Sequence, residues 1–369
     1  MTDISSPFQV LFNILLFIII FIILNKKYFN WRVNYNNTTV VWACVLVLLF
    51  CLFPYWGSDY WHYLYGYYEM RAGAKTNMED VYYTLANIAP TYFLFRLTIW
   101  GGALLLLLLS FHRLKLNIGL ALFFFVCLFI PLFSYARVSV AMSMAFCGLA
   151  FIITSNKRIP TTLFGLGLIV ASFFFHKSAV FGIVVATIGL VTLISDRLSI
   201  AVVVLLVPIL MSAVRLHLLD FMDLSSDEFV AIGVGQQYLG EEADAIGISQ
   251  LLRIYLQRLA LLLVLILNIK ISFEHSDIIP DRIKVYANTA TICIAAVFIL
   301  LLSGTSLNIS KIAIRLSYYA WIPTIIFMSY CCENNLYVKW VKGIWSVATI
   351  STIFDLSYSL YCSINNMGI

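Results

Sequence analysis

Several lysine and arginine side chains lie beside long apolar segments of this sequence, where they could bind an anion. The topology argued below places a set of them at one face of a membrane, namely Arg96, Arg137, Lys177, Arg253, Arg258, Lys311 and Arg315. A cation at membrane depth is costly and is usually paired or functional. A single one of these residues could extend to lipid phosphates, but that explanation weakens for a whole set on one face. The set therefore indicates a binding site for an anion such as a phosphate or diphosphate.

Two of the arginines have surroundings that suit a diphosphate. Arg137 follows a proline and a break in the apolar pattern, so it opens a predicted helix whose free N–H groups and dipole favour an anion. Arg315 has a lysine one turn before it and two tyrosines one turn after it, namely Lys311, Tyr318 and Tyr319. Residues three and four apart share a helix face. Two cations and two phenols on one face could hold a diphosphate and stack a sugar.

Two histidines could supply a base for a hydroxyl nucleophile. His176 ends a predicted helix, and the charge of Lys177 beside it favours the neutral imidazole that accepts a proton. Asp59 and His62 are three residues apart, and a carboxylate beside an imidazole fixes its tautomer and raises its basicity. The alternatives are a simple hydrogen bond at the helix end and an aromatic belt at the membrane interface. We take His176 as the first choice for the base and the Asp59–His62 pair as the second.

The chain that carries these residues is too apolar to fold in water. Of its 369 residues, 62% are hydrophobic and 11% are charged, and the mean hydropathy is +0.95. A soluble globular chain is about 45–50% apolar and about 25% charged, so a soluble enzyme and a nucleic-acid binder are excluded. The apolar runs have the length of membrane-crossing helices and not of barrel strands. We therefore predict an all-α polytopic membrane protein, with residues 1–369 forming a single integral membrane domain.

About twelve apolar segments are predicted to span the membrane. They are residues 8–24, 39–55, 90–110, 117–134, 138–154, 161–175, 178–194, 198–213, 249–269, 285–302, 313–330 and 344–361. The short loops after the first, third, fifth and seventh segments are basic, so the positive-inside rule places them in the cytoplasm. Two longer loops, residues 56–90 and 214–248, are then external. Loops of this length often carry function, and in the first of them Tyr63 and Tyr67 are predicted to stack on sugar rings.

The eight cysteines give no sign of a metal site. They are scattered, no CxxC pair occurs, and most fall in apolar runs, where a thiol packs as a small hydrophobic group. We expect them to be reduced and structural, and we predict neither a metal nor a cofactor.

Four short segments resemble a known family. They are GSDYWHYLY at 57–65, YARVSVA at 135–141, FFFHKSA at 173–179 and RLSYY at 315–319. Together they resemble the EpsG-like branch of the Wzy-type polysaccharide polymerases, over the chain from about residue 56 to about residue 330. Arg137 and Arg315 fall on the arginine-bearing segments of the family. His176 falls on its histidine-bearing turn, and Asp59 falls on the acidic residue of its first external loop.

The resemblance implies a glycosyltransferase on the outer face of the bacterial cytoplasmic membrane. Such enzymes join oligosaccharide repeat units carried on undecaprenyl diphosphate, with one unit as donor and a sugar hydroxyl of another as acceptor, to make O-antigen, capsule or exopolysaccharide. Their external arginines are held to engage the diphosphate without a metal. Arg137 and Arg315 would then bind the diphosphate, with Lys177, Arg253 and Lys311 in support. The same pathway would supply a flippase and a chain-length regulator as partners.

Two features of this sequence depart from that family pattern. Arg253 matches no family motif, so its assignment depends on charge placement alone. The second external loop is acidic where a basic motif would be expected. Other classes also stay open at this stage: a transferase that adds a single sugar, a transporter or flippase of lipid-linked glycan, and a non-catalytic membrane subunit.

Overall fold

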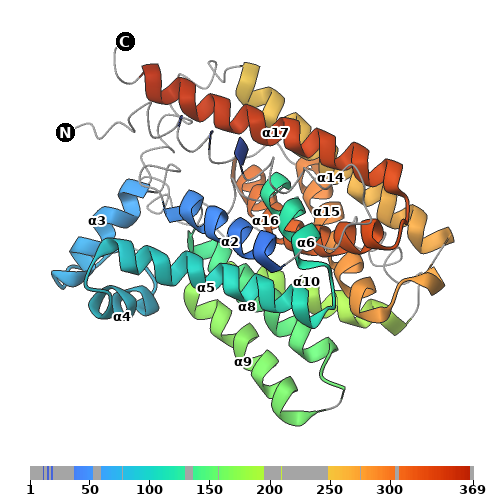
Figure 1. The fold of residues 1–369 in the computed structure, drawn as a ribbon, viewed down its shortest axis with the longest axis horizontal. Helices are drawn as coiled ribbons and strands as arrows, with labels where there is room; N and C mark the ends of the chain where they lie inside the picture. The colour runs from blue at the N-terminus through green and yellow to red at the C-terminus, as the bar shows by residue number, and fades with distance from the viewer. Residues whose placement is uncertain are drawn as a thin grey trace.

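The structure is a computed structural model that describes most of the chain. The described residues are 37–52, 60–76, 78–128, 136–156, 158–194, 248–274, 276–303 and 307–365, with single positions at 11, 15, 18, 19 and 209. They form helices and contain no strand (Figure 1), so the predicted all-α class is confirmed.

The helices fall into two runs along the chain. The first run is α2 (Asn37–Leu52), α3 (Tyr60–Arg71), α4 (Asp80–Ile88), α5 (Tyr92–Arg113), α6 (Ile118–Leu128), α8 (Ala136–Ile153), α9 (Ile159–Phe175), α10 (Ala179–Val191) and the short η1 (Thr192–Ile194). The second run is α14 (Ile248–Glu274), η4 (Ser276–Ile278), α15 (Asp281–Ser303), α16 (Leu307–Glu333) and α17 (Val338–Asn365).

Helices coincide with every predicted apolar segment that the structure describes. The segments 8–24 and 198–213 lie outside the described residues, apart from single positions. Among the described helices, Tyr92–Arg113 and Asp281–Leu300 are long and apolar enough to cross a membrane by length and composition. The apolar helices support a membrane protein, while the number of twelve spans stays a prediction.

The predicted first external loop, residues 56–90, contains the two short helices α3 and α4. Tyr63, Tyr67 and Met70 recur on one face of α3, and all three are buried. The side chains of Tyr63 and Tyr67 are buried against the neighbouring α5. This burial stabilises a helix although the stretch contains no long apolar run. The second predicted loop, 214–248, lies outside the described residues except for its last residue.

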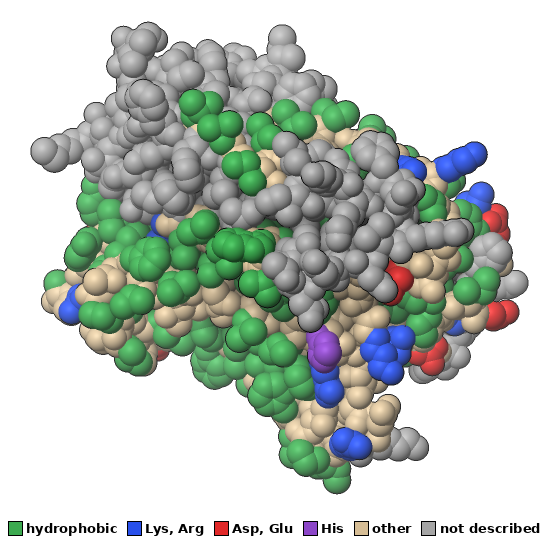
Figure 2. All heavy atoms as spheres, viewed as in Figure 1, with side chains coloured by type: hydrophobic (Ala, Val, Ile, Leu, Met, Phe, Trp, Pro, Cys, Tyr) green, Lys and Arg blue, Asp and Glu red, His purple; other side chains and the backbone are tan. Residues whose placement is uncertain are grey.

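Helix α8 forms the centre of the first run. It packs between α5 and α9, and its residues from 139 to 150 are all buried. Helix α9, in contrast, exposes an apolar stripe that includes Leu163, Val170 and Phe174. Apolar side chains cover much of the described part of the visible face, and charged side chains gather mainly at its right (Figure 2). An exposed apolar stripe of this kind suits a lipid environment.

Polar contacts tie the turns together at one end of the bundle. The Asn117 N–H donates to the Glu333 carboxylate at 3.3 Å, and the Tyr330 hydroxyl donates to the Ile278 carbonyl at 3.2 Å. The guanidinium of Arg113 lies 4.4 Å from the centre of the Phe151 ring, so α5 and α8 end together. These turns are among those that the charge pattern predicts to share one side of the membrane. Helices α3 and α4 lie at the opposite end of α5 (Figure 1).

Two glycines bring α8 and α9 into backbone contact. A Cβ atom on Gly165 would lie 2.6 Å from the Gly148 carbonyl oxygen and 2.8 Å from Cγ1 of Ile152. A Cβ atom on Gly148 would in turn meet the Gly165 carbonyl oxygen. Small residues allow this close approach between membrane helices, so the crossing of α8 and α9 depends on both glycines.

We expect Gly165→Ala to lower the free energy of unfolding by about 1–3 kcal/mol, because the added methyl group has no space against a backbone carbonyl. The measurement is thermal unfolding of the purified protein in detergent. Gly167→Ala is the matched control on the same helix, since a Cβ atom there would meet nothing within 4 Å. Equal stability of the two variants would contradict the assigned helix contact.

Candidate active site

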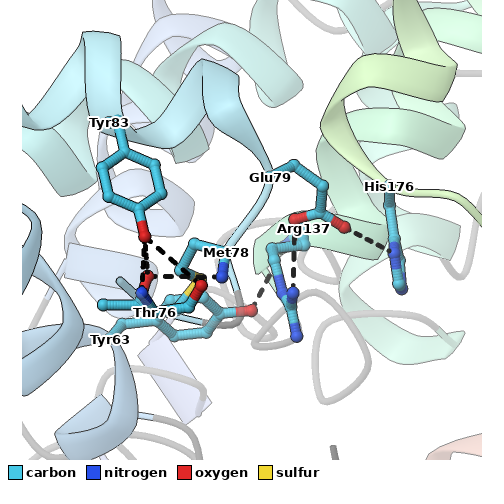
Figure 3. Close-up of polar contacts among 7 residues, drawn as sticks. All are labelled: Tyr63, Thr76, Met78, Glu79, Tyr83, Arg137 and His176. Atoms are coloured by element: carbon cyan, nitrogen blue, oxygen red, sulfur yellow. Dashed lines mark hydrogen bonds and ion pairs between the residues drawn. The ribbon is translucent and has the colours of Figure 1, made fainter. Parts of the chain in front are cut away.

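The carboxylate of Glu79 joins two residues that are far apart in the sequence. Its Oε2 atom lies 3.2 Å from Nη1 of Arg137, and its Oε1 atom lies 3.2 Å from Nδ1 of His176 (Figure 3). Glu79 precedes α4, Arg137 stands in the first turn of α8, and His176 follows α9. We refer to these three residues as the Glu79 cluster.

The turn that carries Glu79 is held by contacts of its own. The Thr76 hydroxyl and the Tyr83 hydroxyl are 3.0 Å apart, and the Met78 N–H donates to the Thr76 hydroxyl (Figure 3). Glu79 occupies the N-cap position of α4, but its side chain makes no capping hydrogen bond. The carboxylate is therefore directed to Arg137 and His176 and not to the helix that it precedes.

Arg137 and His176 are fixed by their backbones. The Arg137 N–H donates to the Tyr63 hydroxyl at 3.4 Å, and the Tyr63 ring packs edge-on against Trp100 with centroids 6.4 Å apart. His176 is the C-cap residue of α9, and its N–H donates to the Ser172 carbonyl at 3.2 Å. Helices α3, α8 and α9 thus all contribute to the position of the cluster.

The electrostatics of the cluster keep Glu79 ionised. Burial alone would raise the pKa of the Glu79 carboxyl, but the hydrogen bond to His176 and the charge of Arg137 outweigh it, so the pKa lies below its ordinary value. The side chains of Arg137, Glu79 and His176 are 13%, 13% and 11% exposed. They are buried enough to interact strongly, and each keeps an accessible edge.

An ionised carboxylate sets the tautomer of His176. Because a carboxylate only accepts hydrogen bonds, Nδ1 of His176 must carry the proton that it shares with Glu79. Whenever the ring is neutral, its lone pair is therefore on Nε2, which bonds no residue in the described part of the chain. This is the arrangement in which a carboxylate orients an imidazole to act as a general base.

Tyr82 adds a buried donor beside the cluster. Its residue is 0% exposed, its hydroxyl has no hydrogen-bond partner among the described residues, and its ring packs edge-on against Phe175 at 5.9 Å. Burial is the largest cause that holds the pKa of Tyr82 well above its ordinary value, and electrostatic interactions with Tyr63 and Glu79 raise it further. The hydroxyl therefore keeps its proton. Buried polar groups are normally satisfied, so the Tyr82 hydroxyl is an exception within the described residues.

A second contact brings α16 to the same turn. The Ser178 hydroxyl lies 2.8 Å from the Tyr319 hydroxyl, and both residues are buried. A Cβ atom on Gly182 would lie 2.7 Å from Cε1 of the Tyr319 ring, so the absence of a side chain there makes room for the phenol. Arg315 lies one helical turn, about 6 Å along the axis, before Tyr319. The segments that carry His176 and Arg315 are therefore neighbours.

The structure places the other predicted site residues as follows. Asp59 lies outside the described residues, as do the side chains of His62, Arg253, Lys311 and Arg315. Lys177 is exposed directly after His176, and Tyr318 is half-buried on α16.

Three of the four tyrosines predicted to bind sugar are inside the helical packing. Tyr63 is 4% exposed beside Arg137. Tyr67 is 1% exposed, donates to the Ala89 carbonyl at 2.8 Å and accepts from Arg71. Tyr319 is 0% exposed. Because Tyr63, Tyr67 and Tyr319 are all buried, we leave these three out of the proposed sugar-binding surface.

Sequence reasoning did not single out Glu79, the central residue of the cluster. The pair Glu79 and Asp80 precedes a helix, which is a common place for acidic residues that interact with the helix N-terminus. The local pattern therefore indicates a capping role. The one signal in favour of a site is that Arg137, predicted at the external face, needs a counter-ion from an external loop.

Within the described residues, no three His, Cys, Asp or Glu side chains lie together as a metal site would require. The family model described as the EpsG family matches residues 39–368, which include the whole Glu79 cluster and Tyr319. The comparisons with curated proteins and with solved structures found no match.

Proposed function

Because the chain belongs to the EpsG family, which is associated with polysaccharide polymerases, we propose that it joins undecaprenyl-diphosphate-linked oligosaccharide repeat units. The observation that carries this proposal is the Glu79 cluster. It holds a cation for the diphosphate and an oriented imidazole for the acceptor hydroxyl in contact with one carboxylate. The reaction takes place on the outer face of the bacterial cytoplasmic membrane.

The cationic residues bind the donor through its diphosphate. The guanidinium of Arg137 forms charge-assisted hydrogen bonds to phosphate oxygens, and the exposed Lys177 follows His176 in the turn after α9. We assign Arg315, one turn before Tyr319 on α16, to the same diphosphate, with Lys311 and Arg253 in support. Fixed positive charge at this place stabilises the negative charge that develops on the departing diphosphate.

His176 activates the acceptor. Its Nε2 atom takes the proton of an acceptor sugar hydroxyl as the oxygen attacks the anomeric carbon of the donor. The bond between that carbon and the diphosphate oxygen breaks, and the electron pair leaves with the diphosphate. Tyr318, which is half-buried on α16, contributes to the sugar-binding surface. A flippase that delivers the units and a chain-length regulator are the proposed partners.

The function is tested by deleting the gene in its bacterium and sizing the surface glycan. We expect the ladder of long chains to collapse to a single repeat unit, because export and assembly of that unit remain intact. Reintroduction of the wild-type gene restores the ladder. A single-sugar transferase would instead leave a truncated repeat, and a transporter would leave no lipid-linked unit at the outer face, so either result contradicts the proposal.

A further inference from the structure

The two carboxylate oxygens of Glu79 contact two different groups, the His176 imidazole and the Arg137 guanidinium, and the proposed reaction depends on both. One oxygen accepts from His176 and the other pairs with Arg137. We propose that Glu79 is a positioning residue that orients His176 and also competes with the diphosphate for Arg137. This inference deepens the proposed function and rests on it.

The orienting effect follows from the His176 side of the carboxylate. The bond from Nδ1 to Oε1 at 3.2 Å fixes both the tautomer and the plane of the imidazole ring. The same carboxylate stabilises the imidazolium that forms when Nε2 takes a proton. Removing the charge of Glu79 should therefore slow the chemical step and leave the fold unchanged.

The competition follows from the Arg137 side. The ion pair between Nη1 and Oε2 is 3.2 Å long and largely buried, so an arriving diphosphate meets a guanidinium that is already partly neutralised. Two anions on one cation repel each other, and the carboxylate lowers the affinity for the diphosphate. The same repulsion promotes release of the product diphosphate, which shares the charged group of the donor, and so allows turnover.

The local backbone does not depend on the Glu79 side chain. The carboxylate makes no capping hydrogen bond to α4, and the turn is held by the Thr76–Tyr83 contact and by the Tyr82 N–H donating to the Glu79 carbonyl at 2.9 Å. A substitution that keeps the shape of the side chain should therefore leave the turn in place. This separates the positioning role from a structural one.

The test uses the full chain in lipid nanodiscs, with farnesyl diphosphate as the binding probe and chain elongation as the rate. Glu79→Gln is expected to bind the probe about tenfold more tightly. A neighbouring charge changes a protonation equilibrium by a factor of about ten or more, and we expect a similar factor for binding of the anion to Arg137. Its kcat is expected to fall by about 10²–10⁴-fold. Asp80→Asn is the matched control: it removes the same charge from an exposed neighbour, and neither value should change by more than about twofold.

A second variant tests the same idea with the charge retained. Glu79→Asp is one methylene shorter and cannot reach both partners, so kcat should fall without tighter binding of the probe. Probe affinity that is unchanged or weaker in Glu79→Gln overturns the competition, and an unchanged kcat overturns the orienting effect. If the wild-type chain elongates nothing, the proposed function fails, and the probe affinities still decide whether Glu79 competes for Arg137.

Discussion

Replacing His176 with glutamine is expected to lower the elongation rate by about 10²–10⁴-fold, the usual contribution of a general base. The glutamine amide can still donate to Glu79, so the ion pair with Arg137 should persist, but no group remains to take the acceptor proton. The measurement is the single-turnover rate of elongation by the purified chain in nanodiscs. Binding of farnesyl diphosphate should stay within about twofold of wild type, because the base makes no contact with the diphosphate in this mechanism.

The control for this substitution is His112→Gln. His112 is exposed in the last turn of α5, at the other end of the bundle, so its removal should leave elongation unchanged. A His176→Gln enzyme that elongates at the wild-type rate would contradict the assignment of the base. In that case the Asp59–His62 pair becomes the first candidate.

Replacing Arg137 with alanine is expected to weaken binding of farnesyl diphosphate by about 10²-fold or more, the effect of truncating one partner of a buried charge pair. The loss has two sources. The cation that holds the phosphate oxygens is gone, and the Glu79 carboxylate is left without compensation and repels the anion. In cells, the surface glycan should shift from a ladder to a single repeat unit.

A double variant separates those two sources. Glu79→Gln combined with Arg137→Ala should recover part of the lost affinity, because the repelling charge is removed as well. Lys75→Ala is the control, since Lys75 is an exposed cation on the turn between α3 and α4. Normal glycan length in the Arg137→Ala strain would exclude Arg137 from the diphosphate site.

The helices could be predicted from the sequence wherever a long apolar run was present. Segments such as 138–154 and 285–302 coincide with α8 and α15 because an apolar run of this length has one stable backbone state in lipid. Helices α3 and α4 were not predicted as elements. Their helical state depends on tertiary burial of Tyr63 and Tyr82, and tertiary contacts are not visible in a local pattern.

The candidate site could be predicted only in part. Arg137 and His176 were assigned to one face from the order of the helices, and the structure brings them to a common partner. Glu79 was missed because the local signal of an acid before a helix indicates capping. Tyr67 was predicted to bind sugar because an aromatic ring can stack on a sugar ring. In the structure its hydroxyl is instead hydrogen-bonded inside the protein, to the Ala89 carbonyl and to Arg71.

The glycine contact between α8 and α9 has a geometric consequence for the cluster. Arg137 precedes Gly148 by eleven residues, and His176 follows Gly165 by eleven, so the two helices form equal arms from one pivot. At 1.5 Å per residue each arm is about 16 Å long, and opening the angle by about 10° would separate the two ends by about 3 Å. That movement exceeds what one carboxylate can span. The crossing angle at the glycine pivot therefore sets whether cation and base can be held by the same acid.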